Sequence, residues 1–322
     1  MSIVISGSVA YDYLMSFPGY FREHILLDRL DTISLSFLVD SMVRQRGGTA
    51  PNIAFTLALL GERPMIFATV GEDFSDYRAW LESNGVDTTY ARVVKGCYTA
   101  SFFANTDRAN NQISSFYPGA MAFATQMSLT SLPEKPDLVI ISPNDPAAMS
   151  QYVEECKAGG IPYLYDLGQQ VVRLSAEELR RGVQQANSVF VNEYEFELLQ
   201  KHTGFTADEI IQEVGILVVT LGAKGAAIYT GGEKYEVGTV PPKQILDPTG
   251  VGDAFRGGFV RGMSLGLDWT TCGQMGALAA AYCLETKGPQ EHHFTPAEFI
   301  ARYRQHFDDQ GKLDVLLNSI AG

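Results

Sequence analysis

Several features that define common protein classes are missing from this chain of 322 residues. No G-x-x-x-x-G-K-S/T stretch occurs, which excludes a Walker-type nucleotide site, and no G-x-G-x-x-G follows a predicted strand, which excludes a dinucleotide-binding dehydrogenase. The adjacent pair His292–His293 lacks further ligands at metal spacing, so we expect a surface or loop feature. C-x-x-C spacing is also absent from the four cysteines, as in proteins of a reducing cytosol: Cys97, Cys156, Cys272 and Cys283.

Basic residues and long apolar runs are scarce as well. The chain carries 24 Lys and Arg against 37 Asp and Glu, and this formal charge of -13 argues against nucleic acid and anionic membranes as partners. No run approaches the roughly 20 apolar residues of a membrane span, and the apolar run Ile3–Ile5 is too short for a signal peptide. We therefore expect a globular, cytoplasmic protein that binds small molecules.

Short β-branched runs alternate with helical stretches, which predicts an α/β fold with a mainly parallel sheet covered by helices on both faces. Strands are predicted at 3–6, 65–70, 138–141, 163–166, 188–191 and 217–220. Helices are predicted at 52–60, 77–83, 149–158, 176–185 and 208–214, and through most of the chain after 252. Residues 13–46 and 96–118 break this alternation, and 97–104 and 112–117 predict a hairpin around 107–111. A symmetric register about Ala109 would set Phe102 opposite Phe116, a pair that can hold a flat base or simply pack.

The most informative stretch of the chain joins two acids to a glycine-rich turn. It leads into an apolar run, 255–265, that predicts a helix, and it reads Asp247-Pro248-Thr249-Gly250-Val251-Gly252-Asp253-Ala254-Phe255. Glycines let backbone N–H groups converge, and the start of a helix adds unpaired donors and the positive end of its dipole. A carboxylate beside such an anion site suits phosphoryl transfer to a hydroxyl, with Asp253 as the base. A simple helix cap is the alternative.

Other polar residues follow strands or begin helices. Asp12 comes soon after the first strand, and Asn52 begins a helix behind Gly48, so these residues can bind sugar hydroxyls or serve as a turn residue and a cap. Asn192 and Glu195 follow another strand and can converge on one helical face or form a capping box. A tight glycine turn ends a further strand at Thr220-Leu221-Gly222-Ala223-Lys224-Gly225.

Together these stretches resemble the ribokinase or PfkB carbohydrate kinase family. Residues 247–253 resemble its D-T-x-G-A-G-D signature, with Pro248 and Val251 in place of commoner residues. An upstream family signature is matched by Gly47-Gly48-Thr49-Ala50-Pro51-Asn52, and 192–195 and 220–225 follow in the expected order. The resemblance implies a ribokinase-like three-layer α/β/α core over 1–12, 47–95 and 119–322. It also implies a β-sheet lid from 13–46 and 96–118, through which a homodimer can form.

The same resemblance implies the roles of individual residues, with ATP and Mg²⁺ as cofactors. Asp253 would be the catalytic base, and Asp12, Gly48 and Asn52 would bind the sugar diol. Glu195 would hold Mg²⁺ through water, and Asp247 would lie near a monovalent cation such as K⁺. The anion hole would comprise Gly250, Val251, Gly252 and Asp253. The ATP site would comprise Asn192, Glu195, Thr220, Gly222, Lys224, Gly225, Arg256 and Cys283.

Within the family, three stretches resemble bacterial adenosine kinases: DPTGVGDAFR at 247–256, the paired Gln169–Gln170, and the tail 284–291. Phe102 and Phe116 would then sandwich adenine, the glutamine amides would read its edge, and Ser8 and Ser36 would add hydroxyl contacts. The expected activity is ATP-dependent phosphorylation of the 5′-hydroxyl of adenosine, a step of purine salvage. Two alternatives stay open: a ribose or fructose kinase whose lid is packed by the phenylalanines, and a catalytically silent regulatory protein of the same fold.

Overall fold

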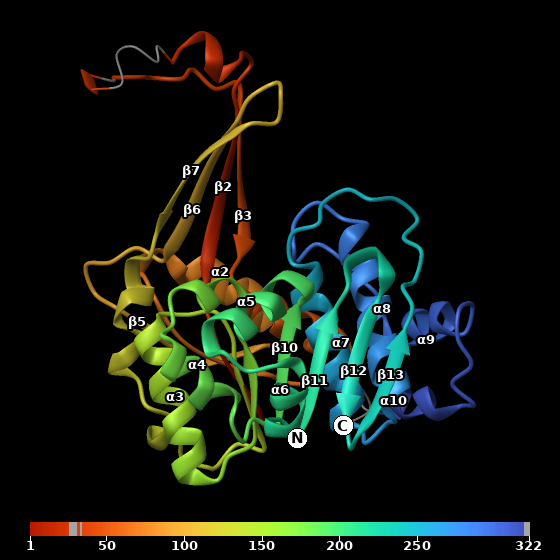
Figure 1. Ribbon diagram of the computed structural model, residues 1–322. Helices are drawn as coiled ribbons and strands as arrows, with labels where there is room; N and C mark the ends of the chain where they lie inside the picture. Colours follow the sequence, from red (N-terminus) through yellow and green to blue (C-terminus); the bar gives the residue numbers. More distant parts are fainter. Residues whose placement is uncertain (26–30, 33, 319–322) are drawn as a thin grey trace.

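The computed structural model describes residues 1–25, 31, 32 and 34–318, so part of the predicted lid segment 13–46 lies outside the described residues. A nine-stranded sheet has the order β13-β12-β11-β10-β9-β8-β1-β4-β5 (Figure 1). Pairing is parallel from β5 to β11 and antiparallel for β12 and β13. The strands are β1 (Ile3–Ser6), β4 (Met65–Val70), β5 (Asp87–Val93), β8 (Leu138–Ile141), β9 (Tyr163–Asp166), β10 (Ser188–Asn192), β11 (Ile216–Thr220), β12 (Ala226–Thr230) and β13 (Glu233–Val237).

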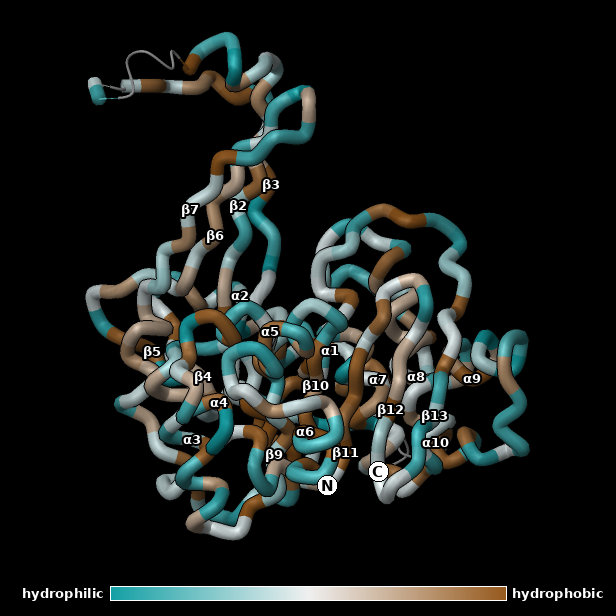
Figure 2. The backbone as a smooth tube through the Cα atoms, in the orientation of Figure 1, coloured by the Kyte–Doolittle hydropathy of each residue, from teal (hydrophilic) through white to brown (hydrophobic). Residues whose placement is uncertain are grey.

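Two apolar layers enclose this sheet because successive strand residues point to opposite faces. In β1, Ile3 and Ile5 belong to one core cluster and Val4 to the other, and the strands of the sheet include strongly hydrophobic stretches (Figure 2). One cluster contains residues of α1 (Thr49–Leu59), α2 (Ser75–Ser83), α7 (Val251–Ser264) and α8 (Trp269–Leu284). The other contains α3 (Pro146–Gly159), α4 (Ala176–Val183), α5 (Glu193–Thr203) and α6 (Ala207–Glu213). The three-layer α/β/α core is therefore confirmed, and α9 (Pro296–Tyr303) and α10 (Val315–Asn318) pack beyond α8.

A separate four-stranded sheet projects from the core (Figure 1). Its order is β3-β2-β6-β7, from β2 (Ala10–Ser16), β3 (Ser41–Gly47), β6 (Ala100–Thr106) and β7 (Gln112–Tyr117). Asp12 is paired with Phe102, and Phe102 with Phe116 as the symmetric hairpin predicts, so these three side chains share one face. Because β2 begins at Ala10, the predicted core boundary after residue 12 falls inside a strand. The division into core and lid remains a proposal.

The sequence prediction and the structure differ in a few places. The six strands predicted for the large sheet match within one residue, but its β5 and the antiparallel pair β12–β13 are not predicted, and the hairpin strand predicted at 97–104 is observed at Ala100–Thr106. The histidine pair lies in a loop, in agreement with the expected surface or loop feature, although His292 is only 1% exposed. Its Nε2 is 3.1 Å from Thr56 Oγ1 because the loop folds back onto α1. Among the described residues, no helix is long and apolar enough to span a membrane.

The buried His292 makes a prediction about acid stability. Burial lowers the pKa of His292 to about 3, so the unfolded chain binds a proton below its ordinary pKa of 6.5 and the folded chain does not. The stability that a neutral ring contributes is thus present above pH 6.5 and falls by about 1.4 kcal/mol per pH unit toward pH 3. The free energy of unfolding, measured with urea, should therefore decrease less between pH 7 and pH 5 for His292→Gln than for the wild type. Equal losses in both proteins would contradict a buried neutral histidine.

Candidate active site

Polar residues from distant parts of the sequence meet at the carboxyl ends of the parallel strands. Ser8 follows β1, Asp166 ends β9, Asn192 ends β10 and Thr220 ends β11. In an open parallel sheet this edge forms the usual ligand crevice, because loops leave the strands there on both sides. The second turn of α7 reaches the same edge through Arg256, which hydrogen-bonds to Asp166.

The glycine-rich turn takes the conformation that its sequence predicts. Gly250 has a left-handed backbone (φ 76°) and is the N-cap of α7, followed by Val251, Gly252 and Asp253 in the first turn. Helix geometry leaves the first backbone N–H groups of α7 without acceptors inside the helix. These donors and the positive end of the helix dipole suit the turn to binding an anion.

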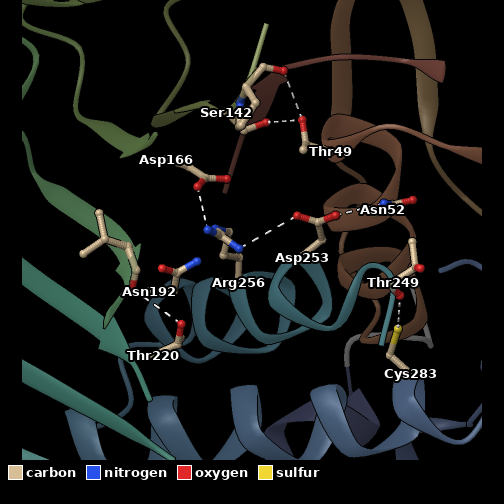
Figure 3. A network of polar contacts seen from close by, with 12 residues as sticks. Thr49, Asn52, Ser142, Asp166, Asn192, Thr220, Thr249, Asp253, Arg256 and Cys283 are labelled. Carbon is tan, nitrogen blue, oxygen red and sulfur yellow. Dashed lines mark hydrogen bonds and ion pairs between the residues drawn. The ribbon is translucent and has the colours of Figure 1, made fainter. Parts of the chain in front are cut away.

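A chain of buried polar side chains surrounds Asp253 (Figure 3). Asn52 Nδ2 donates to Asp253 Oδ2 at 2.8 Å, and Arg256 Nη1 lies 3.8 Å from Asp253 Oδ1. Arg256 Nη2 donates to Asp166 Oδ1 at 2.6 Å. The Asp166 side chain is 1% exposed, whereas those of Arg256 and Asp253 are 12% and 13% exposed. Asp253 therefore lies at the mouth of a buried charge cluster, with Asp166 at its base.

The cluster changes the acidity of its carboxyl groups. Burial raises the pKa of Asp253 to about 6, although Arg256 and the hydrogen bond from Asn52 act in the opposite direction. Burial likewise raises the pKa of Asp166 to about 7 against the attraction of Arg256. Burial also opposes the charge of Arg256, but Asp166 and Asp253 outweigh it and raise the pKa of the guanidinium. Asp253 thus combines an ionised state at neutral pH with a basicity suited to accepting a proton.

A cavity of ≈ 310 Å³ contains most of the residues predicted to contact an acceptor base. It is lined by Ser8, Phe102, Phe116, Met121, Pro143, Gln169, Gln170 and Arg173. Gln170 is 4% exposed and its Nε2 donates to the carbonyl oxygen of Asn144 at 2.8 Å. Its Oε1 has no hydrogen-bond partner among the residues that the structure describes. The structure therefore leaves an unpaired, buried acceptor on a residue that lines this cavity.

The remaining predicted acceptor-side residues divide into two groups. Gly48 has φ 96° and is the N-cap of the helix that carries Asn52, and a side chain there would overlap the carbonyl oxygen of Ser8. Burial, reinforced by the charge of Asp247, raises the pKa of Asp12 to about 6. The structure does not bring Ser36 to the cavity. Ser16 and Ser41 form the last β2–β3 pair, at the end of the small sheet that is distal to the core. Ser36 precedes this pair in the chain and is exposed beyond the end of the sheet.

Two carboxylates predicted to lie near cations already accept backbone hydrogen bonds. Asp247 accepts from the N–H groups of Thr249 at 2.9 Å and Gly288 at 3.1 Å. Glu195 Oε2 accepts from Asn192 N at 2.8 Å, and Asn192 Oδ1 accepts from Glu195 N at 2.8 Å, which is a complete capping box. Among the described residues, no group of three or more His, Cys, Asp or Glu side chains is placed to hold a metal ion.

The other predicted ATP-side residues lie at two places. Thr220, Gly222, Lys224 and Gly225 form the end of β11 and the turn after it, where Lys224 Nζ is 3.4 Å from Glu193 Oε1 on the surface. Cys283 is fully buried in α8, and its Sγ lies 3.5 Å from the carbonyl oxygen of Thr249. The thiol therefore supports the loop before α7 from below.

Sequence reasoning missed three residues of this network: Asp166, Tyr77 and Gln290. Asp166 is visible in the sequence only as the acid that ends a predicted strand. Gln290 Nε2 donates to Asn52 Oδ1 at 2.9 Å and to the Tyr77 hydroxyl, but neither contact has a local sequence signal.

Comparisons with known proteins show which proteins this chain is similar to. The profile of the pfkB family carbohydrate kinases matches residues 18–296. The nucleoside kinase of Burkholderia thailandensis, in its structure with inosine, is 36% identical in sequence to this chain. The match covers 95% of this chain and 97% of the Burkholderia chain, with a TM-score of 0.86. The same protein with ADP-inosine is 38% identical over 95% of this chain and 96% of that chain, with a TM-score of 0.83. The nucleoside kinase of Methanocaldococcus jannaschii is 28% identical over 94% of this chain and 97% of its own length.

The turn before α7 makes a prediction about stability. Gly250→Ala would combine a left-handed residue, which costs about 1–2 kcal/mol, with an overlap between the new Cβ and Pro289 Cβ. Gly232→Ala is the matched control, because its φ is 80° and nothing lies within 4 Å of the added Cβ. We expect the free energy of unfolding, measured with urea, to decrease clearly more in Gly250→Ala than in Gly232→Ala. Equal losses would mean that the turn is not packed against Pro289.

Proposed function

This chain belongs to the PfkB family of carbohydrate kinases, which are phosphotransferases with an alcohol acceptor, and we propose that it is an ATP-dependent nucleoside kinase. The observation that carries the proposal is the buried Asp253 carboxylate at the start of α7, held by Asn52 beside an anion-binding turn. Adenosine is the first candidate acceptor and inosine the second. The product would be the nucleoside 5′-monophosphate, as purine salvage requires.

The proposed chemistry assigns separate tasks to the two ends of the site. Asp12, Gly48 and Asn52 would hold the ribose hydroxyls, and Asn52 Nδ2 keeps one N–H for this purpose after bonding to Asp253. Asp253 would accept the proton of the 5′-hydroxyl as its oxygen attacks the γ-phosphorus of ATP. The backbone N–H groups of residues 250–253 would stabilise the charge on the transferred phosphoryl group, and ADP would leave. Arg256 would offset part of the negative charge of the two carboxylates, while Asp166 holds the guanidinium in place.

Support for a nucleoside comes from the cavity. Phe102 and Phe116 lie opposite each other on the face of the small sheet that carries Asp12, and both line the cavity with the two glutamines. Stacking on such rings is worth about 1–3 kcal/mol per base. The unpaired Oε1 of Gln170 needs a donor, which adenine supplies with its N6 amino group. Inosine is kept because hypoxanthine also has a ring N–H, and because the Burkholderia relative was solved with inosine.

The ATP side of the proposal rests on residues at the ends of β10 and β11. Asn192, Glu195 and the turn 220–225 would bind the phosphates, and Lys224 would add a positive charge. Mg²⁺ fits Glu195 because only Oε2 of this carboxylate accepts a hydrogen bond among the described residues, which leaves Oε1 for a metal-bound water. Bound Mg²⁺ would neutralise the charge of the ATP phosphates. K⁺ near Asp247, a lid role for the small sheet, dimerisation through that sheet and a cytoplasmic location are further parts of the proposal.

A panel of acceptors tests this function. ADP release from ATP and Mg²⁺ should be fastest with adenosine or inosine and slow with ribose and fructose. Phe116→Ala should raise the nucleoside KM by about tenfold or more through lost stacking. Phe103→Ala is the matched control, because Phe103 is also exposed but lies on the opposite face, stacked on Tyr13.

Other outcomes of the panel would point elsewhere. Turnover with ribose or fructose alone would support the kinase chemistry but contradict a base pocket, and it would mean that the two phenylalanines simply pack the lid. A folded protein that binds ATP and turns over no acceptor would favour the silent regulatory alternative.

A further inference from the structure

A continuous line of buried hydrogen bonds runs from Asp253 to the base of the small sheet. Asn52 Nδ2 donates to Asp253, Asn52 Oδ1 accepts from Gln290 Nε2 at 2.9 Å, and Gln290 Nε2 also donates to the Tyr77 hydroxyl. Tyr77 in turn donates to the carbonyl oxygen of Gly47 at 2.9 Å. Tyr77, Gln290 and Asn52 are 0%, 1% and 5% exposed, so water does not compete for these bonds.

The chemistry of each group fixes the direction of this line. The carbonyl oxygen of Gly47 can only accept, so the Tyr77 hydroxyl must donate to it and can accept only from the amide of Gln290. Both hydrogens of Gln290 Nε2 are then used, one toward Tyr77 and one toward Asn52 Oδ1. With its oxygen held by Gln290, Asn52 can present only its NH₂ group to Asp253. A reversed Asn52 would set its oxygen against the carboxylate and its NH₂ against Gln290.

We infer that Gln290 is a positioning residue for phosphoryl transfer, which orients the amide of Asn52 so that a hydrogen-bond donor faces Asp253. The inference rests on the proposed role of Asp253 as the base. A donor at this position stabilises the ionised carboxylate, which is the form that can accept a proton. Tyr77 supports Gln290 from the other side, because it ties the second hydrogen of the amide to the end of β3.

Of the groups around this line, Gln290 is the one that can orient the amide of Asn52. Asp253 faces Arg256 on its own helix, Glu195 of α5 and Cys283 of α8, and it faces Asp166 of β9 through Arg256. Asp12, Tyr11 and Arg46 face Tyr77. Among the described residues, none of these groups hydrogen-bonds to Asn52 Oδ1, whereas Gln290 does. The charged neighbours therefore act on Asp253 directly and do not select the orientation of Asn52.

The test compares three variants of the full-length protein with the wild type. Gln290→Met keeps an unbranched side chain but removes both donors, so kcat should fall on the order of tenfold. The acid limb of the pH dependence of kcat should move upward by about one pH unit, because the ionised Asp253 loses its fixed donor. Tyr77→Phe should move the limb in the same direction by less. Gln274→Met is the matched control, because it removes another Tyr–Gln hydrogen bond, between Gln274 of α8 and Tyr303 of α9. This variant should change neither kcat nor the acid limb.

Each result has a defined meaning. A folded Gln290→Met protein with the wild-type kcat and acid limb would overturn the inference, and if that variant does not fold, an unshifted limb in folded Tyr77→Phe would overturn it. A wild type that phosphorylates no acceptor would instead overturn the proposed function from which the inference starts. A shift in Gln290→Met and Tyr77→Phe, absent from Gln274→Met, would support the inference, since a general loss of packing would not move an acid limb.

Discussion

The buried guanidinium of Arg256, placed between two carboxylates, is the interaction on which the candidate site depends. It ties β9 to α7 through Asp166, and through Asp253 and Asn52 it reaches α1. Removing charges from water is costly, so the cluster persists only because each charged group has a partner. Without the cation, two acidic groups would remain buried side by side, and the pKa of both would rise further. An ionised carboxylate at this depth therefore requires the whole cluster.

The large sheet explains why these residues can meet at all. Its parallel strands end at one edge, which collects residues as far apart in the chain as Ser8, Asp166 and Thr220. The small sheet adds Asp12 and the two phenylalanines from strands that face the same edge. The residues of the candidate site thus come from strands and helices and from the short turns that directly follow the strands. This arrangement suits a reaction that depends on alignment and on excluding water.

The sequence predicts the parts of this structure that depend on local pattern. Buried runs give six strands of the large sheet within one residue, and Gly250 supplies the left-handed residue at which the turn before α7 starts the helix. Long-range partners have no such signal: Asp166 and Arg256 are 90 positions apart, and Asn52 and Gln290 are 238 apart. The pattern Asn192–Glu195 predicts the capping box, and a cap can also serve ATP. The position of Ser36 could not be predicted either, since it depends on a strand register that no local pattern fixes.

The most direct test of this account is the pH dependence of kcat/KM for the nucleoside in the wild type, compared with kcat in Asp253→Asn. Because Asp253 must be ionised to accept a proton and its pKa is raised to about 6, kcat/KM should fall as the pH drops through 6 and stay level above it. Asp253→Asn should lose kcat by about 10²–10⁴-fold with the nucleoside KM near that of the wild type. A wild-type kcat in a folded Asp253→Asn protein would contradict the account.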